Sequence, residues 1–330
     1  MDRAEDPPRP CIVHLVRAAN GEAPFAGFVD ALRSAPPGGD FELVLAMKGF
    51  ASEQDGQRYA ELADGLSPEL LFFADEGLDL NVYFAAAAQL QRERYCFVNS
   101  FSRPLVAGWL EKLDGALAQP GVGLVGASGS WASTFSWMAH MMGLPNAYSG
   151  ILPPRRAAIE QFLALEAELV EDPGSAPAPT LVERFGKKLR TLRRLPGDTL
   201  PFERFPAHHI RTNAFMLSQA TLSALRLHEI RQKRDAYRLE HGRNSITHQV
   251  QRLGLRALVV DRDGATYDCE QWDRSRTFWQ GDQEGLLVAD NQTRRYAEGD
   301  ASRRRLLSSF AWGVKADPLL PAPAPAGATR

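Results

Sequence analysis

Short apolar segments alternate with amphipathic segments along the N-terminal part of the chain. The apolar segments are rich in β-branched and aromatic residues and end in small or charged residues, a pattern typical of buried strands. We predict strands at 11–16, 41–47, 70–74 and 95–98, and helices at 25–32, 53–64 and 81–92. Because strands and helices alternate, this order predicts βα units that form a parallel sheet covered on both faces.

The alternation continues with less regularity further along the chain. A helix is predicted over 104–118, a strand over 122–129, a strand over 209–217 and a short helix over 219–227. Asn244 or Ser245 is expected to cap a helix that ends near Gly254, and a last strand follows at 255–260. The predicted fold class is therefore α/β, with a mostly parallel sheet flanked by helices.

Residues 153–200 show a different pattern, which we interpret as a helical insertion. A helix at 155–170 is followed by a proline-rich segment and a second helix at 180–195, whose apolar residues form one stripe. The other positions of this second helix are largely basic: Arg184, Lys187, Lys188, Arg190, Arg193 and Arg194. This pattern suits an anionic membrane surface, and it equally suits a solvated helix that packs by its stripe.

Composition indicates which binding partners and which cellular compartment to expect for this chain. The chain has 330 residues, 44% of them hydrophobic, and a formal net charge of −2, so no overall attraction to nucleic acid is expected. The three cysteines lack metal-site spacing, and no apolar run reaches the ~18 residues needed to span a bilayer. We expect a cytoplasmic protein, peripheral on the inner membrane face if the basic helix binds lipid, with disordered ends at 1–10 and 316–330 around one domain at 11–315.

Polar side chains follow each of the first four predicted strands. The carboxyl ends of parallel strands meet at one edge of a sheet, where α/β proteins bind ligands. Short polar and charged side chains at that edge suit a phosphate or a sugar. The residues concerned are Arg17, Asn20, Lys48, Asp75, Glu76, Asp79, Asn99 and Ser100.

Taken in this order, the elements over roughly 11–315 resemble a nucleotide-sugar-dependent glycosyltransferase of the GT-A fold, most like the family 2 type of bacterial polysaccharide assembly. The resemblance rests on the acidic turn that begins at Asp75, the segment Cys96-Phe97-Val98-Asn99-Ser100-Phe101-Ser102 at the place of the family's Asp-x-Asp, the segment Arg211-Thr212-Asn213, and Glu240 before a helix ending in Gly254-Leu255-Arg256. It implies a Rossmann-like sheet and transfer of a sugar from a nucleotide-diphosphate sugar to a hydroxyl of a saccharide or lipid-linked acceptor, with inversion.

The resemblance also implies roles for individual residues. Glu240 takes the place of the general base, and its alternative is a carboxylate that complements a helix N-terminus. Arg243 is a candidate to neutralise the leaving diphosphate, as is the run Arg303-Arg304-Arg305 if the tail folds over the site; otherwise that run is a solvated face. On the acceptor side the candidates are Arg211, Asn213 and Trp279. Trp272, Trp279 and Trp312 either stack on sugar rings or belong to the core.

The chain departs from the family at the metal motif. Asn99, Ser100 and Phe101 provide no carboxylate, whereas Mg²⁺ and Mn²⁺ favour anionic oxygen ligands. The sequence therefore predicts weak metal dependence, with Asp75 and Asp79 as the substitute ligands if a metal binds.

Two other functions stay open at this point. A sugar-nucleotide nucleotidyltransferase shares the βα alternation, although such enzymes open with a glycine-rich phosphate loop and the first polar turn here contains only Gly21. A catalytically silent, carbohydrate-binding relative is compatible with the missing carboxylates at Asn99 and Phe101.

Overall fold

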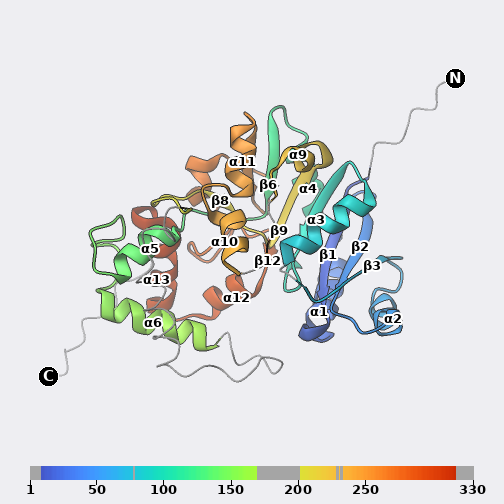
Figure 1. Ribbon diagram of the computed structural model, residues 1–330, viewed down its shortest axis with the longest axis horizontal. Helices are drawn as coiled ribbons and strands as arrows, with labels where there is room; N and C mark the ends of the chain where they lie inside the picture. Colours follow the sequence, from blue (N-terminus) through green and yellow to red (C-terminus); the bar gives the residue numbers. More distant parts are fainter. Residues whose placement is uncertain (1–8, 77–78, 169–200, 228–229, 231–232, 317–330) are drawn as a thin grey trace.

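The computed structural model describes residues 9–76, 79–168, 201–227, 230 and 233–316 (Figure 1). The predicted basic helix at 180–195, most of the N-terminal segment 1–10 and the tail at 317–330 lie outside the described residues. Of the predicted insertion, the first helix is present as α6 (Arg155–Glu168).

An eight-stranded sheet forms the centre of the molecule, in the order β3-β2-β1-β4-β9-β6-β10-β11. Its neighbours are parallel except at β9, which is antiparallel to both β4 and β6, and at β11, which is antiparallel to β10. The strands are β1 (Cys11–Arg17), β2 (Glu42–Lys48), β3 (Glu69–Phe73), β4 (Arg94–Val98), β6 (Val122–Gly126), β9 (Ala214–Ser218), β10 (Arg256–Val260) and β11 (Thr266–Tyr267). The predicted α/β class, with a mostly parallel sheet flanked by helices, is confirmed.

Helices cover both faces of this sheet, as its apolar strands require. Successive residues of β1 point to opposite faces, so Ile12 joins one hydrophobic cluster and Val13 the other. The first cluster includes residues of α1 (Ala23–Ser34), α2 (Glu53–Leu62) and α4 (Trp109–Leu117). The second includes residues of α3 (Asp79–Leu90), α10 (Lys233–His241) and α11 (Ile246–Arg252).

Three further helices gather on the side of the molecule away from β3 (Figure 1). They are α5 (Thr134–Met141), α6 and α13 (Ala301–Trp312). Trp137, Phe162 and Phe310 join them, with ring centroids of Trp137 and Phe162 4.2 Å apart. The remaining helices are α9 (Gln219–Ala224) and α12 (Asn291–Glu298). No helix within the described residues is long and apolar enough to cross a membrane.

Each of two predicted strands is divided into two shorter strands in the structure. The strand predicted at 122–129 is β6 followed by β7 (Gly129–Ser130), and the strand predicted at 209–217 is β8 (His209–Ile210) followed by β9. β7 and β8 leave the main sheet and pair with each other. The hydroxyl of Ser128 donates to Asn213 Oδ1 at 2.9 Å, which holds the two polar breaks together.

The start predicted for the helix at 104–118 is wrong. Arg103–Pro104 form strand β5, which pairs with β12 (Val288–Ala289), and α4 begins only at Trp109. Gly108 precedes α4 with a φ of 72°, a left-handed conformation that favours glycine. The predicted cap at Ser245 is confirmed, because its side chain accepts the His248 backbone N–H.

Candidate active site

A cavity of about 640 Å³ lies where β4 ends and the antiparallel strand β9 begins. This is the carboxyl edge of β4 and β6, the place predicted for a ligand. Five residues predicted for the site line the cavity: Asn99, Arg211, Asn213, Glu240 and Trp279. The structure therefore brings together residues that lie as far apart in the sequence as Asn99 and Trp279.

Glu240 is held in this cavity by the segment before β9. It lies in the last turn of α10, is half-buried, and its Oε1 accepts the hydroxyl of Thr212 at 3.1 Å. The alternative role, a carboxylate that complements the N-terminus of the following helix, does not fit, since Glu240 lies in the last turn of α10 and α11 begins only at Ile246. Local helix stability therefore does not explain why a glutamate occupies this position.

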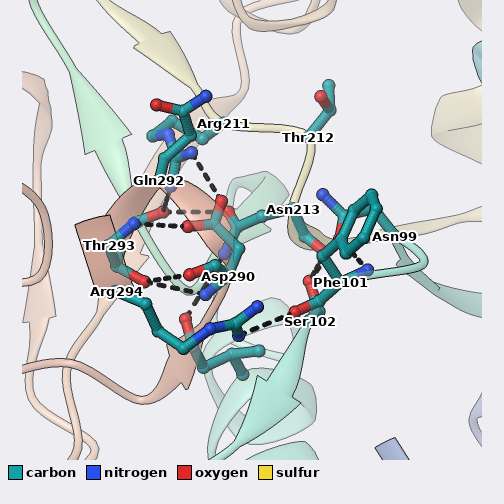
Figure 2. Close-up of polar contacts among 12 residues, drawn as sticks. Asn99, Phe101, Ser102, Arg211, Thr212, Asn213, Asp290, Gln292, Thr293 and Arg294 are labelled. Carbon is teal, nitrogen blue, oxygen red and sulfur yellow. Dashed lines mark hydrogen bonds and ion pairs between the residues drawn. The ribbon is translucent and has the colours of Figure 1, made fainter. Parts of the chain in front are cut away.

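Arg211 and Asp290 form a buried ion pair on the cavity wall (Figure 2). Arg211 Nη2 is 2.6 Å from Asp290 Oδ2, and the side chain of Asp290 is 1% exposed. Asp290 also caps α12, because its Oδ1 accepts the Thr293 backbone N–H at 2.8 Å. The guanidinium lies 3.9 Å above the ring of Phe278. Arg211 Nη1 also donates to the Ser128 hydroxyl at 3.3 Å, so three groups fix the guanidinium.

Two neutral histidines face the same cavity. Burial lowers the pKa of His209 well below its usual value, and burial lowers the pKa of His241 to about 4. His209 Nδ1 lies 2.8 Å from the Ala207 carbonyl, an acceptor only, so the proton is on Nδ1 and Nε2 is an acceptor. The two rings are 5.4 Å apart. The cavity therefore holds two uncharged imidazoles at neutral pH.

Aromatic rings make much of the remaining wall. Trp279 stacks on Phe278 at 4.2 Å and donates its indole N–H to the Gln292 carbonyl. Trp137, Phe162 and Phe310 close the opposite side. Trp272 and Trp312, by contrast, are buried in the core, as one of the two readings predicted.

The turn Asn99–Ser102 at the cavity edge uses its polar oxygens internally (Figure 2). Asn99 Oδ1 accepts the Phe101 N–H at 3.0 Å and the Ser102 hydroxyl at 2.9 Å. The hydroxyl of Ser100 donates to the Leu15 carbonyl at 2.9 Å and is buried. A divalent metal needs several oxygens turned toward it, preferably anionic ones, so this turn does not fit a metal ion. Elsewhere in the described part of the chain, no group of three or more His, Cys, Asp or Glu residues is suited to hold one.

The predicted residues at the ends of β1, β2 and β3 form a separate ionic cluster. Lys48 Nζ lies 3.9 Å from both Asp75 Oδ1 and Asp79 Oδ1, and Arg17 lies 3.9 Å from Asp75 and 4.0 Å from Asp79. Burial lowers the pKa of Lys48, and the charge of Asp79 opposes that shift. Because two cations already accompany Asp75 and Asp79, these carboxylates are poor substitutes for an Asp-x-Asp metal site.

The other predicted residues at this edge lie outside the cavity wall. Asn20 is half-buried and its Nδ2 has no hydrogen-bond partner among the described residues, while Glu76 is exposed. Ser100, as described, is turned to the backbone of β1.

The two arginine candidates for the leaving group are placed elsewhere. Arg243 donates to the Phe202 carbonyl at 3.2 Å and does not line the cavity. Helix α13, which contains the run Arg303-Arg304-Arg305, does reach the cavity through Leu307 and Phe310. Arg304, however, bonds the Gly281 carbonyl and Asp282, away from it.

Beyond Trp279, sequence reasoning assigned no residue of the C-terminal segment to the cavity wall. Asp290 and Thr293 carry a recognisable signal, since both side chains form a capping box at the start of α12. No local pattern marks Trp137, Phe162 or Phe310 as cavity residues, because aromatic residues in helices usually pack in a core.

No protein-family model matches the chain, and no curated protein matches it in sequence. Solved structures similar to it include the mannosyltransferase PcManGT from Pyrobaculum calidifontis, in complex with GDP-Man and Mn²⁺, at 12% identity and a TM-score of 0.43 over 82% of this chain. TarS of S. aureus is similar over 36% of this chain, at 15% identity and a TM-score of 0.30. A CMP:2-keto-3-deoxy-manno-octonic acid synthetase complexed with CTP is similar over 78% of it, at 10% identity and a TM-score of 0.38.

The chain spans 60% of the length of the mannosyltransferase, 21% of that of TarS and 91% of that of the synthetase. With TM-scores below 0.5, none of these similarities assigns an activity or a ligand to this chain.

Proposed function

We propose that the protein is a glycosyltransferase that moves a sugar from a nucleotide-diphosphate sugar to a hydroxyl group of a saccharide or lipid-linked acceptor. The observation that carries the proposal is the carboxylate of Glu240 in a cavity at the carboxyl edge of a mostly parallel sheet. The Thr212 hydroxyl, 3.1 Å from Oε1, fixes this carboxylate on the cavity wall, and a carboxylate so placed can take the proton of an acceptor hydroxyl.

The reaction that suits this arrangement is a single displacement. The acceptor oxygen forms a bond to the anomeric carbon while the bond from that carbon to the donor diphosphate breaks. The electron pair of the broken bond leaves with the diphosphate, and the hydroxyl proton passes to Glu240. Such a step inverts the configuration of the sugar carbon, because attack and departure occur on opposite sides.

The cavity suits the acceptor side of this reaction. Aromatic faces such as Trp279 pack against the C–H faces of sugar rings, and a polar group at their edge fixes the orientation of hydroxyls. Arg211 supplies such a group, and its position is fixed by Asp290. Neutral His209 offers Nε2 as an acceptor for a sugar hydroxyl.

The ionic cluster of Arg17, Lys48, Asp75 and Asp79 suits the nucleoside end of the donor. It lies at the ends of β1, β2 and β3, further along the same sheet edge than the cavity at the end of β4. Exposed carboxylates accept hydrogen bonds from ribose hydroxyls and base N–H groups. A donor bridging the two regions would present its diphosphate near the turn Asn99–Ser102.

The test is release of nucleotide from a panel of UDP-, GDP- and CMP-linked sugars, with and without saccharide acceptors. We expect nucleoside diphosphate release from at least one donor and its loss in Glu240→Gln. Glu111→Gln, an exposed glutamate of α4, is the matched control and should retain activity. Synthesis of a sugar nucleotide from a nucleoside triphosphate would instead assign a nucleotidyltransferase. Absence of both reactions with every donor, although nucleotides bind, would assign a silent binding protein.

A further inference from the structure

Two arginines meet at the turn Asn99–Ser102 that does not fit a metal ion. Arg103 directly follows the turn in β5. Arg294 comes from α12, and its Nη1 donates to the Phe101 carbonyl at 3.1 Å, as Figure 2 shows. Strands β5 and β12 pair with each other, which brings the start of α12 to this turn. The positive charge of Arg103 acts on Arg294, so the two side chains lie near each other although they come from distant parts of the sequence.

The fold makes room for Arg103 through a glycine. Its guanidinium lies against the backbone of α1 at Gly27, where a Cβ atom would come within 2.5 Å of Arg103 Nη2. Any larger residue at 27 would displace the guanidinium, because that contact is far shorter than a van der Waals distance. The position of this cation is therefore determined by α1 as well as by β5.

This arginine pair forms no ion pair within the described residues. Neither Arg103 nor Arg294 forms an ion pair with a described carboxylate, and the nearby Asp290 is taken by Arg211 at 2.6 Å. Both side chains are half-buried. Burial lowers the pKa of Arg294 and the positive charge of Arg103 lowers it further, while the charges of Asp290 and Glu298 oppose the shift only in part. Two like charges in a partly dehydrated place are unfavourable until an anion joins them.

We propose that Arg103 and Arg294 bind the diphosphate of the nucleotide-sugar donor and neutralise the leaving group in place of a divalent metal ion. This inference rests on the proposed function. Planar guanidinium groups form paired hydrogen bonds with phosphate oxygens, and their charge does not depend on a metal. The turn supplies no metal ligands but presents the Phe101 carbonyl that orients Arg294.

The experiment is calorimetry with the full chain in EDTA, using UDP and GDP, the corresponding nucleosides, and inorganic pyrophosphate. We expect Arg103→Gln and Arg294→Gln each to weaken binding of the nucleoside diphosphate and of pyrophosphate at least tenfold, with nucleoside binding unchanged. Arg256→Gln is the matched control, since it removes an arginine at the opposite end of the sheet, where β10 begins. If a glutamine variant melts early, the Arg103→Lys and Arg294→Lys variants, which keep the charge, should bind more tightly than a neutral variant that remains folded.

Three results would overturn the inference. Binding that appears only with Mn²⁺ or Mg²⁺ would place a metal at the diphosphate and leave the glycosyltransferase proposal intact. Equal affinities in the glutamine variants and wild type would remove both arginines from the site. Failure of wild type to bind pyrophosphate or either nucleoside diphosphate would remove the anion site. Conversely, arginine-dependent pyrophosphate binding without any sugar transfer would support the anion site and count against the proposed function.

Discussion

The ionic cluster at the ends of β1–β3 and the cavity beside β4 and β9 use charge in opposite ways. In the cluster, two cations and two carboxylates accompany each other, and Asp75 is 60% exposed. In the cavity, Arg211 is paired with Asp290 out of solvent, and the carboxylate of Glu240 is held by a neutral hydroxyl. At the border between them, Arg103 and Arg294 have no such partner among the described carboxylates.

This difference in burial indicates different roles for the two regions. Lys48 of the cluster is buried, but the carboxylates of Asp75 and Asp79 are exposed, and exposed charges form weak interactions that a ligand can exchange for its own. A buried ion pair is costly to break and therefore keeps one geometry. We infer that the cluster contributes affinity for the donor, while the cavity contributes the fixed positions that a reaction needs.

The largest effect is expected at Glu240. A positioned general base contributes typically 10²–10⁴-fold, so Glu240→Gln should lower kcat by that order and leave donor affinity nearly intact. If the cavity provides the chemistry and the ionic cluster provides the affinity, kcat should fall while donor affinity stays unchanged. Steady-state kinetics with direct measurement of donor binding will check it. A variant that transfers sugar at near wild-type rate would move the base to another group, with Asp290 and Asp235 to be examined next.

A second large effect is expected on stability at Asp290. Removing one partner of a buried ion pair costs about 3–5 kcal/mol, so Asp290→Asn should lower the free energy of unfolding by that order. Asp75→Asn, in the exposed cluster, should change it by less than about 1 kcal/mol. Urea denaturation of the two variants compares the regions directly. Similar losses in both would mean that the difference in burial has no energetic consequence.

Acidification is expected to destabilise the protein through the cavity histidines. His241 has a pKa of about 4 in the folded protein, below the usual 6.5, so between these values the unfolded chain binds more protons. Stability from this group is therefore complete above pH 6.5 and falls as the pH decreases toward 4, by about 2 kcal/mol at pH 5. Urea denaturation at pH 7 and pH 5 should show a smaller loss in His241→Gln than in wild type. Equal losses would contradict this assignment.

The smallest effect is expected for donor binding at Asp75. Asp75→Ala should weaken binding of UDP or GDP about tenfold, equivalent to ~1.4 kcal/mol. The nucleoside alone should lose affinity by a similar factor, unlike in the variants of Arg103 and Arg294. Calorimetry with both ligands measures this. Unchanged nucleoside affinity would exclude Asp75 from the nucleoside site.

The cavity residues were predicted from two kinds of signal. Asn99 follows a predicted strand and Glu240 precedes a predicted helix. Arg211 and Asn213 lay inside the strand predicted at 209–217 and were candidates only through the family resemblance. All four line the cavity. Arg243 was a weaker candidate, because its closeness to Glu240 in the sequence does not determine where its side chain points. Its guanidinium turns to the Phe202 carbonyl instead.

The alternation of apolar and polar residues alone determined the α/β class and the edge at which polar residues collect, because strand and helix periods depend on local geometry. Only the tertiary structure decided which charges meet. Arg211 finds Asp290 79 residues further along the chain, and Arg294 bonds Phe101 across 193 residues. Such partners follow from the return of the C-terminal segment over the sheet edge, which is a consequence of packing and not of any local pattern.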